Sequence, residues 1–258
     1  MQRREFLAAL AAAFPTLAQN KRLRVACDTG SWTIEVPEFQ NLLRVLGEAK
    51  ELGYEGFETA YRNVQGQFEN FKEARTKLDA TGMAFYGVHI FQHDYDPKSN
   101  IPPHLLMQRI AEGVKKLGCQ RLIVSGSPTG GDPERLRWKY FALARGGRMC
   151  RDLNLERLCY QGPVDAELGT LIKESDPDTV RFILENPPAE FFSKFHKRID
   201  GLHLASLPAD NDALAAAVKK TGWQGWIVAA ALPGGEENGP GRSAMEPVRA
   251  EIRKRFNA

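Results

Sequence analysis

The sequence predicts a single α/β domain, a closed (β/α)8 barrel of the TIM type over residues 22–256. Short apolar segments alternate with segments of helical spacing, and eight such pairs follow one another along the chain. Each pair takes about 30 residues, the size of one βαβ step. No glycine-rich nucleotide-binding motif indicates an open sheet, and no change in composition indicates a second domain. The 258 residues therefore suit one barrel.

The predicted strands are short segments rich in Val, Ile, Leu and Phe. Strands that alternate with helices must pair in parallel, and an apolar composition fits strands that are buried on both faces. We expect them at residues 23–27, 56–60, 83–89, 121–125, 157–160, 180–184, 199–204 and 226–230.

The predicted helices lie between these strands. Pro37 suits the first turn of the first helix, and Gly53, Gly82 and Gly118 stand where a helix ends in a left-handed residue. We expect helices at residues 37–52, 68–80, 105–117, 133–150, 166–174, 189–196, 212–220 and 245–256.

Residues 1–18 have the pattern of a secretory signal peptide. Arg3 and Arg4 precede a short apolar stretch, and the small residues of Thr16-Leu17-Ala18 suit cleavage after Ala18. The paired arginines resemble a bacterial twin-arginine export signal. We therefore expect an exported protein, periplasmic or extracellular, although a frayed N-terminal helix is the alternative.

Composition excludes several classes of protein. No run of about 18 apolar residues is present, so we expect no membrane span in the mature form. The formal net charge is +3, or +2 without residues 1–18, which is too small for a nucleic-acid partner. The four cysteines lack the spacing of a zinc site. A Cys119–Cys150 disulfide and buried free thiols are the two alternatives for them.

Functional side chains are expected where the predicted strands end, because the active sites of such barrels lie at the C-terminal ends of the strands. Trp32 follows the first strand. The polar candidates at the strand ends are Asp28, Glu58, His89, Ser125, Tyr160, Gln161, Glu185 and His203.

Local phrases add a resemblance over about residues 22–256 to the xylose isomerase-like superfamily, whose members include sugar phosphate isomerases and epimerases. They are Glu-Leu-Gly-Tyr-Glu-Gly-Phe-Glu at 51–58, Gly-Val-His at 87–89, Leu-Cys-Tyr at 158–160, His-Leu at 203–204 and Gly-Trp-Gln-Gly-Trp at 222–226.

This resemblance implies a divalent ion, manganese or else zinc or magnesium, bound by carboxylates and imidazole. It assigns Glu185 and His203 as metal ligands and Glu58 and His89 as catalytic groups. Such an ion polarises a carbonyl while a neighbouring base removes a proton from the adjacent carbon.

The chain departs from the family pattern at several ligand positions. Gln161 and Pro188 stand where relatives have histidine, and Ala230 stands where they have glutamate. Two ligands rarely hold an ion that takes about six donors. Glu167, Glu236 or Glu237 would have to complete the site from loops.

Two functions follow from this pattern. The first is a sugar or sugar phosphate isomerase or epimerase, with Tyr160, Trp32 and Ser125 binding a small carbohydrate or polyol. The alternative is a degenerate barrel that binds a carbohydrate or a partner without turnover. A zinc apurinic endonuclease is disfavoured, because it needs many more ligands and a basic groove. Glu58, His89 and the aromatic residues also have purely structural interpretations, and the oligomeric state stays open.

Overall fold

The computed structural model describes residues 23–96, 98–205, 211–232 and 238–258, and it confirms the predicted fold. Eight parallel strands pair in sequence order and close into a barrel, with β1 beside β8. The strands are β1 Arg24–Asp28, β2 Gly56–Ala60, β3 Ala84–Ile90, β4 Arg121–Ser125, β5 Arg157–Gly162, β6 Val180–Glu185, β7 Ile199–Ala205 and β8 Trp226–Ala230.

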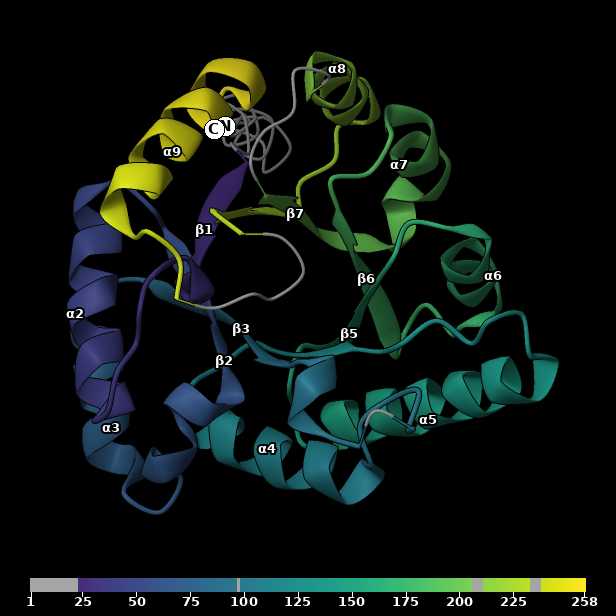
Figure 1. Ribbon diagram of the computed structural model, residues 1–258, viewed down its shortest axis with the longest axis horizontal. Coiled ribbons are helices and arrows are strands. Elements are labelled where there is room, and N and C mark those ends of the chain that lie inside the picture. Colours follow the sequence, from purple (N-terminus) through teal and green to yellow (C-terminus); the bar gives the residue numbers. More distant parts are fainter. Residues whose placement is uncertain (1–22, 97, 206–210, 233–237) are drawn as a thin grey trace, which may run out of the picture.

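The helices form a ring around the strands (Figure 1). Their bounds are α2 Glu38–Glu51, α3 Phe71–Ala80, α4 His104–Lys116, α5 Pro133–Asp152, α6 Ala166–Glu174, α7 Ala189–Phe195, α8 Asn211–Thr221 and α9 Arg242–Phe256. Helix α3 begins three residues later than expected, because residues 68–70 form bends that lead to the N-cap residue Asn70. Helix α9 begins three residues earlier and carries Pro247 inside it. Gly53, Gly82 and Gly118 adopt the positive φ expected after a helix.

The core has two layers, and the smaller one fills the inside of the barrel. The larger layer packs the outer faces of the strands against the helices. The inner layer consists of Ala26, Tyr86, Ile123, Cys159, Ile183, Trp226 and Val228.

A polar layer lies above the inner apolar one, at the C-terminal ends of the strands. Because side chains alternate between the two faces of a strand, the residue two positions after an inner residue also faces inward. This rule gives Asp28 after Ala26, Ser125 after Ile123, and Glu185 after Ile183. It also gives Gln161 in β5 and Ala230 in β8. Five strand ends therefore deliver their residues to the barrel mouth by simple alternation.

Strand β3 reaches the same layer through a register shift. Phe57 pairs with Phe85, but Glu58 pairs with Gly87, so Tyr86 is an extra residue in β3. Bulges of this kind re-aim the side chains that follow them. Tyr86 lies in the inner cluster and Val88 in the outer one, and His89 consequently faces inward three residues after Tyr86.

Three further expectations concern the chain as a whole. All four cysteines are buried free thiols, which excludes the Cys119–Cys150 disulfide. None of the described helices is long and apolar enough to cross a membrane. The expected signal peptide, residues 1–18, lies outside the described residues.

Candidate active site

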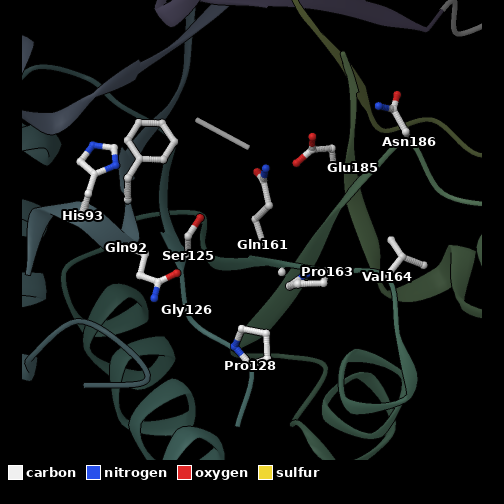
Figure 2. A pocket seen from close by; sticks show the side chains of 12 residues that line it. Gln92, His93, Ser125, Gly126, Pro128, Gln161, Pro163, Val164, Glu185 and Asn186 are labelled. Atoms are coloured by element: carbon white, nitrogen blue, oxygen red, sulfur yellow. The ribbon is translucent and has the colours of Figure 1, made fainter. Parts of the chain in front are cut away.

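A cavity of about 620 Å³ opens at the mouth of the barrel. The ends of β4, β5 and β6 line it together with the loops after β3 to β6, and Figure 2 shows Ser125, Gln161 and Glu185 among the side chains around it. The remaining lining residues are Phe91, Gln92, His93, Gly126, Pro128, Gly162, Pro163, Val164 and Asn186. Of the seven sequence-predicted site residues, Ser125 and Glu185 line this cavity.

Glu58, His89 and Ser125 form a chain of hydrogen bonds that ends at the cavity wall. Glu58 Oε1 lies 2.8 Å from His89 Nδ1, and His89 Nε2 lies 2.7 Å from Ser125 Oγ. Glu58 and His89 are completely buried, whereas Ser125 is half-buried. The structure thus brings together the two predicted catalytic groups, Glu58 and His89. Of the three hydrogen-bonded residues, only Ser125 lines the cavity.

Neighbouring residues hold the His89 ring and the Ser125 backbone in place. The His89 ring stacks on Phe91 with 3.9 Å between ring centroids. The Tyr95 hydroxyl donates a hydrogen bond of 2.8 Å to the carbonyl oxygen of Ser125. A Cβ atom at Gly126 would lie 2.3 Å from the Asn100 carbonyl oxygen, so only glycine fits after Ser125. The hydroxyl is therefore presented from a fixed backbone.

His203 takes part in a second buried pair. Its Nε2 lies 3.6 Å from Asp28 Oδ2, and both side chains are almost completely buried. Burial disfavours the imidazolium, but the Asp28 hydrogen bond and the charges of Glu58, Asp28 and Glu185 outweigh it and raise the pKa of His203 to about 9. At neutral pH His203 is therefore a cation among carboxylates.

Glu185, Gln161 and Asn186 supply polar groups from the other side of the cavity. The side chains of Glu185 and Gln161 point toward the same space in Figure 2. Asn186 donates from its side chain to the Ala205 carbonyl oxygen at 3.0 Å. Within the described part of the chain, Gln161 Oε1 and Asn186 Oδ1 are buried without a hydrogen-bond partner. Buried polar atoms of this kind are available to a ligand.

A third network lies behind the β4 end of the cavity. The Lys139 side chain is fully buried, and its Nζ lies 2.6 Å from both Glu167 Oε1 and the Ser127 carbonyl oxygen. Glu167 Oε2 accepts hydrogen bonds from the Thr129 amide and hydroxyl. Burial lowers the pKa of Lys139 despite this ion pair. Glu167 is therefore committed to the loop after β4 and does not complete a metal site.

Two residues expected to bind substrate lie elsewhere. Tyr160 faces outward between Cys159 and Gln161, and its hydroxyl accepts a hydrogen bond from Lys139 Nζ at 3.2 Å. Trp32 lines a separate cavity of about 370 Å³ and donates from Nε1 to Glu48 Oε2 at 3.0 Å. The structure therefore brings neither ring to the cavity that contains Ser125 and Glu185.

The donor set does not fit the divalent ion that the family resemblance implies. Glu185 and His203 are paired in register on β6 and β7. However, His203 Nε2 already faces Asp28 Oδ2, 3.6 Å away. Among the residues that the structure describes, no three His, Cys, Asp or Glu side chains come together as ligands. Glu236 and Glu237 lie outside the described residues.

The sequence analysis missed several residues that shape the site. Phe91 and Tyr95 lie in the loop after β3, where no periodicity indicates which side chains turn inward. Lys139 lies within an amphipathic helix, where a lysine normally predicts an exposed position. It precedes Tyr160 by 21 residues, and no sequence pattern predicts a contact between them.

No protein-family model and no curated protein sequence matches the chain. Solved structures do match it. A sugar phosphate isomerase/epimerase from Parabacteroides distasonis ATCC 8503 has a TM-score of 0.68 at 14% identity, covering 93% of this chain and 96% of that one.

Two further solved structures are similar. The IolI protein, solved with a zinc atom, has a TM-score of 0.70 at 13% identity, covering 92% of this chain and 100% of its own. A xylose isomerase domain protein from Planctomyces limnophilus has a TM-score of 0.62 at 13% identity, covering 92% and 98%. These neighbours are xylose isomerase-like TIM barrels, and identities this low show a shared fold alone.

Proposed function

We propose that this chain is an isomerase- or epimerase-type enzyme that moves a proton on the carbon next to a carbonyl of a small carbohydrate or polyol. The observation that carries the proposal is the pairing of Glu185 and Ser125 in one cavity, one on β6 and the other on β4. A carboxylate and a hydroxyl on different walls are the two groups that such a proton transfer needs.

In this proposal Glu185 is the base. Its carboxylate lines the cavity and removes the proton from the substrate carbon. Ser125 donates a hydrogen bond to the substrate carbonyl oxygen, where negative charge develops as the proton leaves. His89 and Glu58 stand behind Ser125 and can return a proton along the chain of hydrogen bonds. Glu58 and His89 thus act from behind the cavity wall and not in direct contact with the substrate.

The lining supports a hydroxylated substrate. Gln92, Gln161 and Asn186 present side-chain amides, which donate to and accept from hydroxyl groups. A cavity of about 620 Å³ has the size of a small-molecule site. No step is assigned to a metal ion, because the described donors do not converge on one.

The proposal is tested by hydrogen exchange at carbon. The purified mature chain is incubated in D₂O with a panel of aldoses, ketoses and their phosphates, and the carbon next to the carbonyl is followed by NMR. We expect deuterium incorporation, and we expect Glu185→Gln to slow it by about 10²–10⁴-fold. Ser243→Ala, an exposed helix residue outside the cavity, is the control.

Two results would contradict the proposal. Exchange at the wild-type rate in Glu185→Gln would exclude Glu185 as the base. Saturable sugar binding without any exchange would favour the alternative function, a barrel that binds a carbohydrate without turnover.

A further inference from the structure

We propose that Ser125 is also a nucleophile, and that the cavity cleaves a small hydroxylated ester or lactone through an acyl-serine intermediate. The observation behind this is the connectivity of Glu58, His89 and Ser125. The activity goes beyond proton transfer at carbon, because the serine oxygen forms a covalent bond to the substrate.

The three residues have the geometry of an activated serine. A nucleophile needs a base within hydrogen-bond reach, and the base needs a third group that fixes its ring. His89 contacts Ser125 through Nε2 at 2.7 Å and Glu58 through Nδ1 at 2.8 Å. The two ring nitrogens thus have separate partners, which is the division of roles in a serine–histidine–carboxylate triad.

The environment supports the charges that this role requires. Glu58 is completely buried, and its Oε2 has no hydrogen-bond partner in the described chain. A carboxylate at Glu58 would in turn stabilise the imidazolium that forms on His89 when Ser125 loses its proton. Water-excluded charges of this kind act more strongly than exposed ones.

Gln161 is placed to stabilise the oxyanion. It is the in-register neighbour of Ser125 on β5, and both side chains face the barrel mouth. Strands pair about 4.8 Å apart, so the two residues are neighbours at the cavity wall. Its Oε1 has no partner among the described residues, so the amide is free to turn its N–H toward a ligand. Side-chain amides serve as oxyanion donors in acyl transfer.

The reaction balances with water as the second substrate. Ser125 Oγ transfers its proton to His89 Nε2 and bonds to the carbonyl carbon, whose oxygen becomes the oxyanion. The ester C–O bond then breaks, and His89 gives the proton to the departing alkoxide. Water next gives a proton to His89 and attacks the acyl carbon, and the released Ser125 Oγ regains that proton. The products are a carboxylic acid and an alcohol, or a hydroxy acid from a lactone.

The cavity argues for a small substrate. Its volume of about 620 Å³ is bounded by Phe91, Pro128 and Val164 as well as by the polar side chains. Apolar walls with a few amides suit a compact hydroxylated molecule. A sugar lactone or a short hydroxy ester combines a reactive carbonyl with hydroxyl groups for those amides.

Covalent labelling tests the proposal directly. The mature chain is treated with diisopropyl fluorophosphate, and peptide mass spectrometry locates the modification. We expect one label per chain, on Ser125, together with hydrolysis of 4-nitrophenyl acetate. Labelling and hydrolysis are expected to disappear in Ser125→Ala and to slow by about 10²–10⁴-fold in His89→Gln, which lacks the base.

Ser127→Ala is the matched control. Ser127 is two residues away, and its hydroxyl has no hydrogen-bond partner in the described chain. In this variant we expect Ser125 to be labelled as in the wild type and the rate of ester hydrolysis to be unchanged. Melting curves establish that each variant is folded. An unlabelled Ser125 in the folded wild-type chain overturns the proposal, as does a label on Ser127 or an unchanged rate in a folded His89→Gln. Because carbon exchange in D₂O is measured separately, this proposal and the isomerase proposal can fail independently.

Discussion

His203 Nε2 lies 3.6 Å from Asp28 Oδ2, and this pair joins β7 to β1 past the end of the intervening strand β8. At that end β8 presents only the small side chain of Ala230 to the barrel mouth, which leaves room for the contact. The buried imidazolium compensates the charge of the carboxylates around it.

The charge of His203 makes stability depend on pH. Its pKa is raised from 6.5 to about 9 in the folded chain, since the surrounding carboxylates outweigh the effect of burial. The folded state therefore binds the proton more tightly than the unfolded state, and this contribution to stability is complete below about pH 6.5. We expect the melting temperature to fall as the pH rises from about 6.5 to about 9. The measurement is calorimetry over this range, with His203→Gln as the comparison. If the melting temperature of His203→Gln fell by the same amount over this pH range, the pH dependence would arise from groups other than His203.

Removing one member of the buried Lys139–Glu167 pair is expected to destabilise the chain. The Lys139 side chain is fully buried, so Lys139→Met leaves Glu167 without its cation and should cost about 3–5 kcal/mol in free energy of unfolding. Denaturant unfolding measures the loss. In the double variant Lys139→Met, Glu167→Gln, much of the stability should return, because no unpaired charge remains. A double variant as unstable as the single one would indicate that packing at Lys139 matters more than charge.

The four thiols are expected to resist modification in the folded chain. Burial raises the pKa of Cys119 and of Cys150 to about 12, so neither forms a thiolate at neutral pH. Titration with Ellman's reagent should detect no fast-reacting thiol in the native chain and all four in denaturant. A rapidly reacting native thiol would show that one of these sites opens readily.

Added manganese is expected to leave the melting temperature unchanged. A ligand that binds the folded chain stabilises it by about 2.7 kcal/mol at a concentration of 100 Kd. Because the described His, Asp and Glu side chains do not converge, no such gain is expected. The measurement is a thermal shift with and without MnCl₂ after chelator treatment. Stabilisation that is lost in Glu185→Gln would instead demonstrate a site at β6.

Residues 1–18 are expected to direct export through their paired arginines. The expectation rests on Arg3 and Arg4, which precede a short apolar stretch. Replacing Arg3 and Arg4 by lysine should retain a reporter fused to these residues inside the cell. Cell fractionation distinguishes the outcomes, and unchanged export would exclude a twin-arginine signal.

The barrel could be predicted from sequence because its signals are local. Alternating apolar segments, and glycines such as Gly53 and Gly118, define each unit without reference to the rest of the chain. Inward-facing residues also follow from alternation once one of them is known. Ser125 and Glu185 were therefore accessible as candidates.

The contacts within the site depend on features that alternation does not reveal. Tyr160 is adjacent to Gln161 in β5 and faces the opposite side of the strand. A prediction of the inward-facing residue that is wrong by one position therefore selects the buried Tyr160 ring instead of Gln161, which lines the cavity. The partner of His89 was not predictable, because the extra residue Tyr86 determines which way β3 presents it. Lys139 became buried only because Glu167, 28 positions later, supplies its counter-charge.

The extra residue in β3 has a consequence for comparing this chain with other barrels. A gap is normally placed in a loop, yet here the inserted position lies within a strand, between Phe85 and Gly87. Against a barrel that lacks this extra residue, an ungapped alignment through β3 would match His89 to an outward-facing position and would misassign the group that contacts Glu58. Homologous positions on either side of Tyr86 must therefore be matched by spatial superposition, with the one-residue offset kept inside the strand.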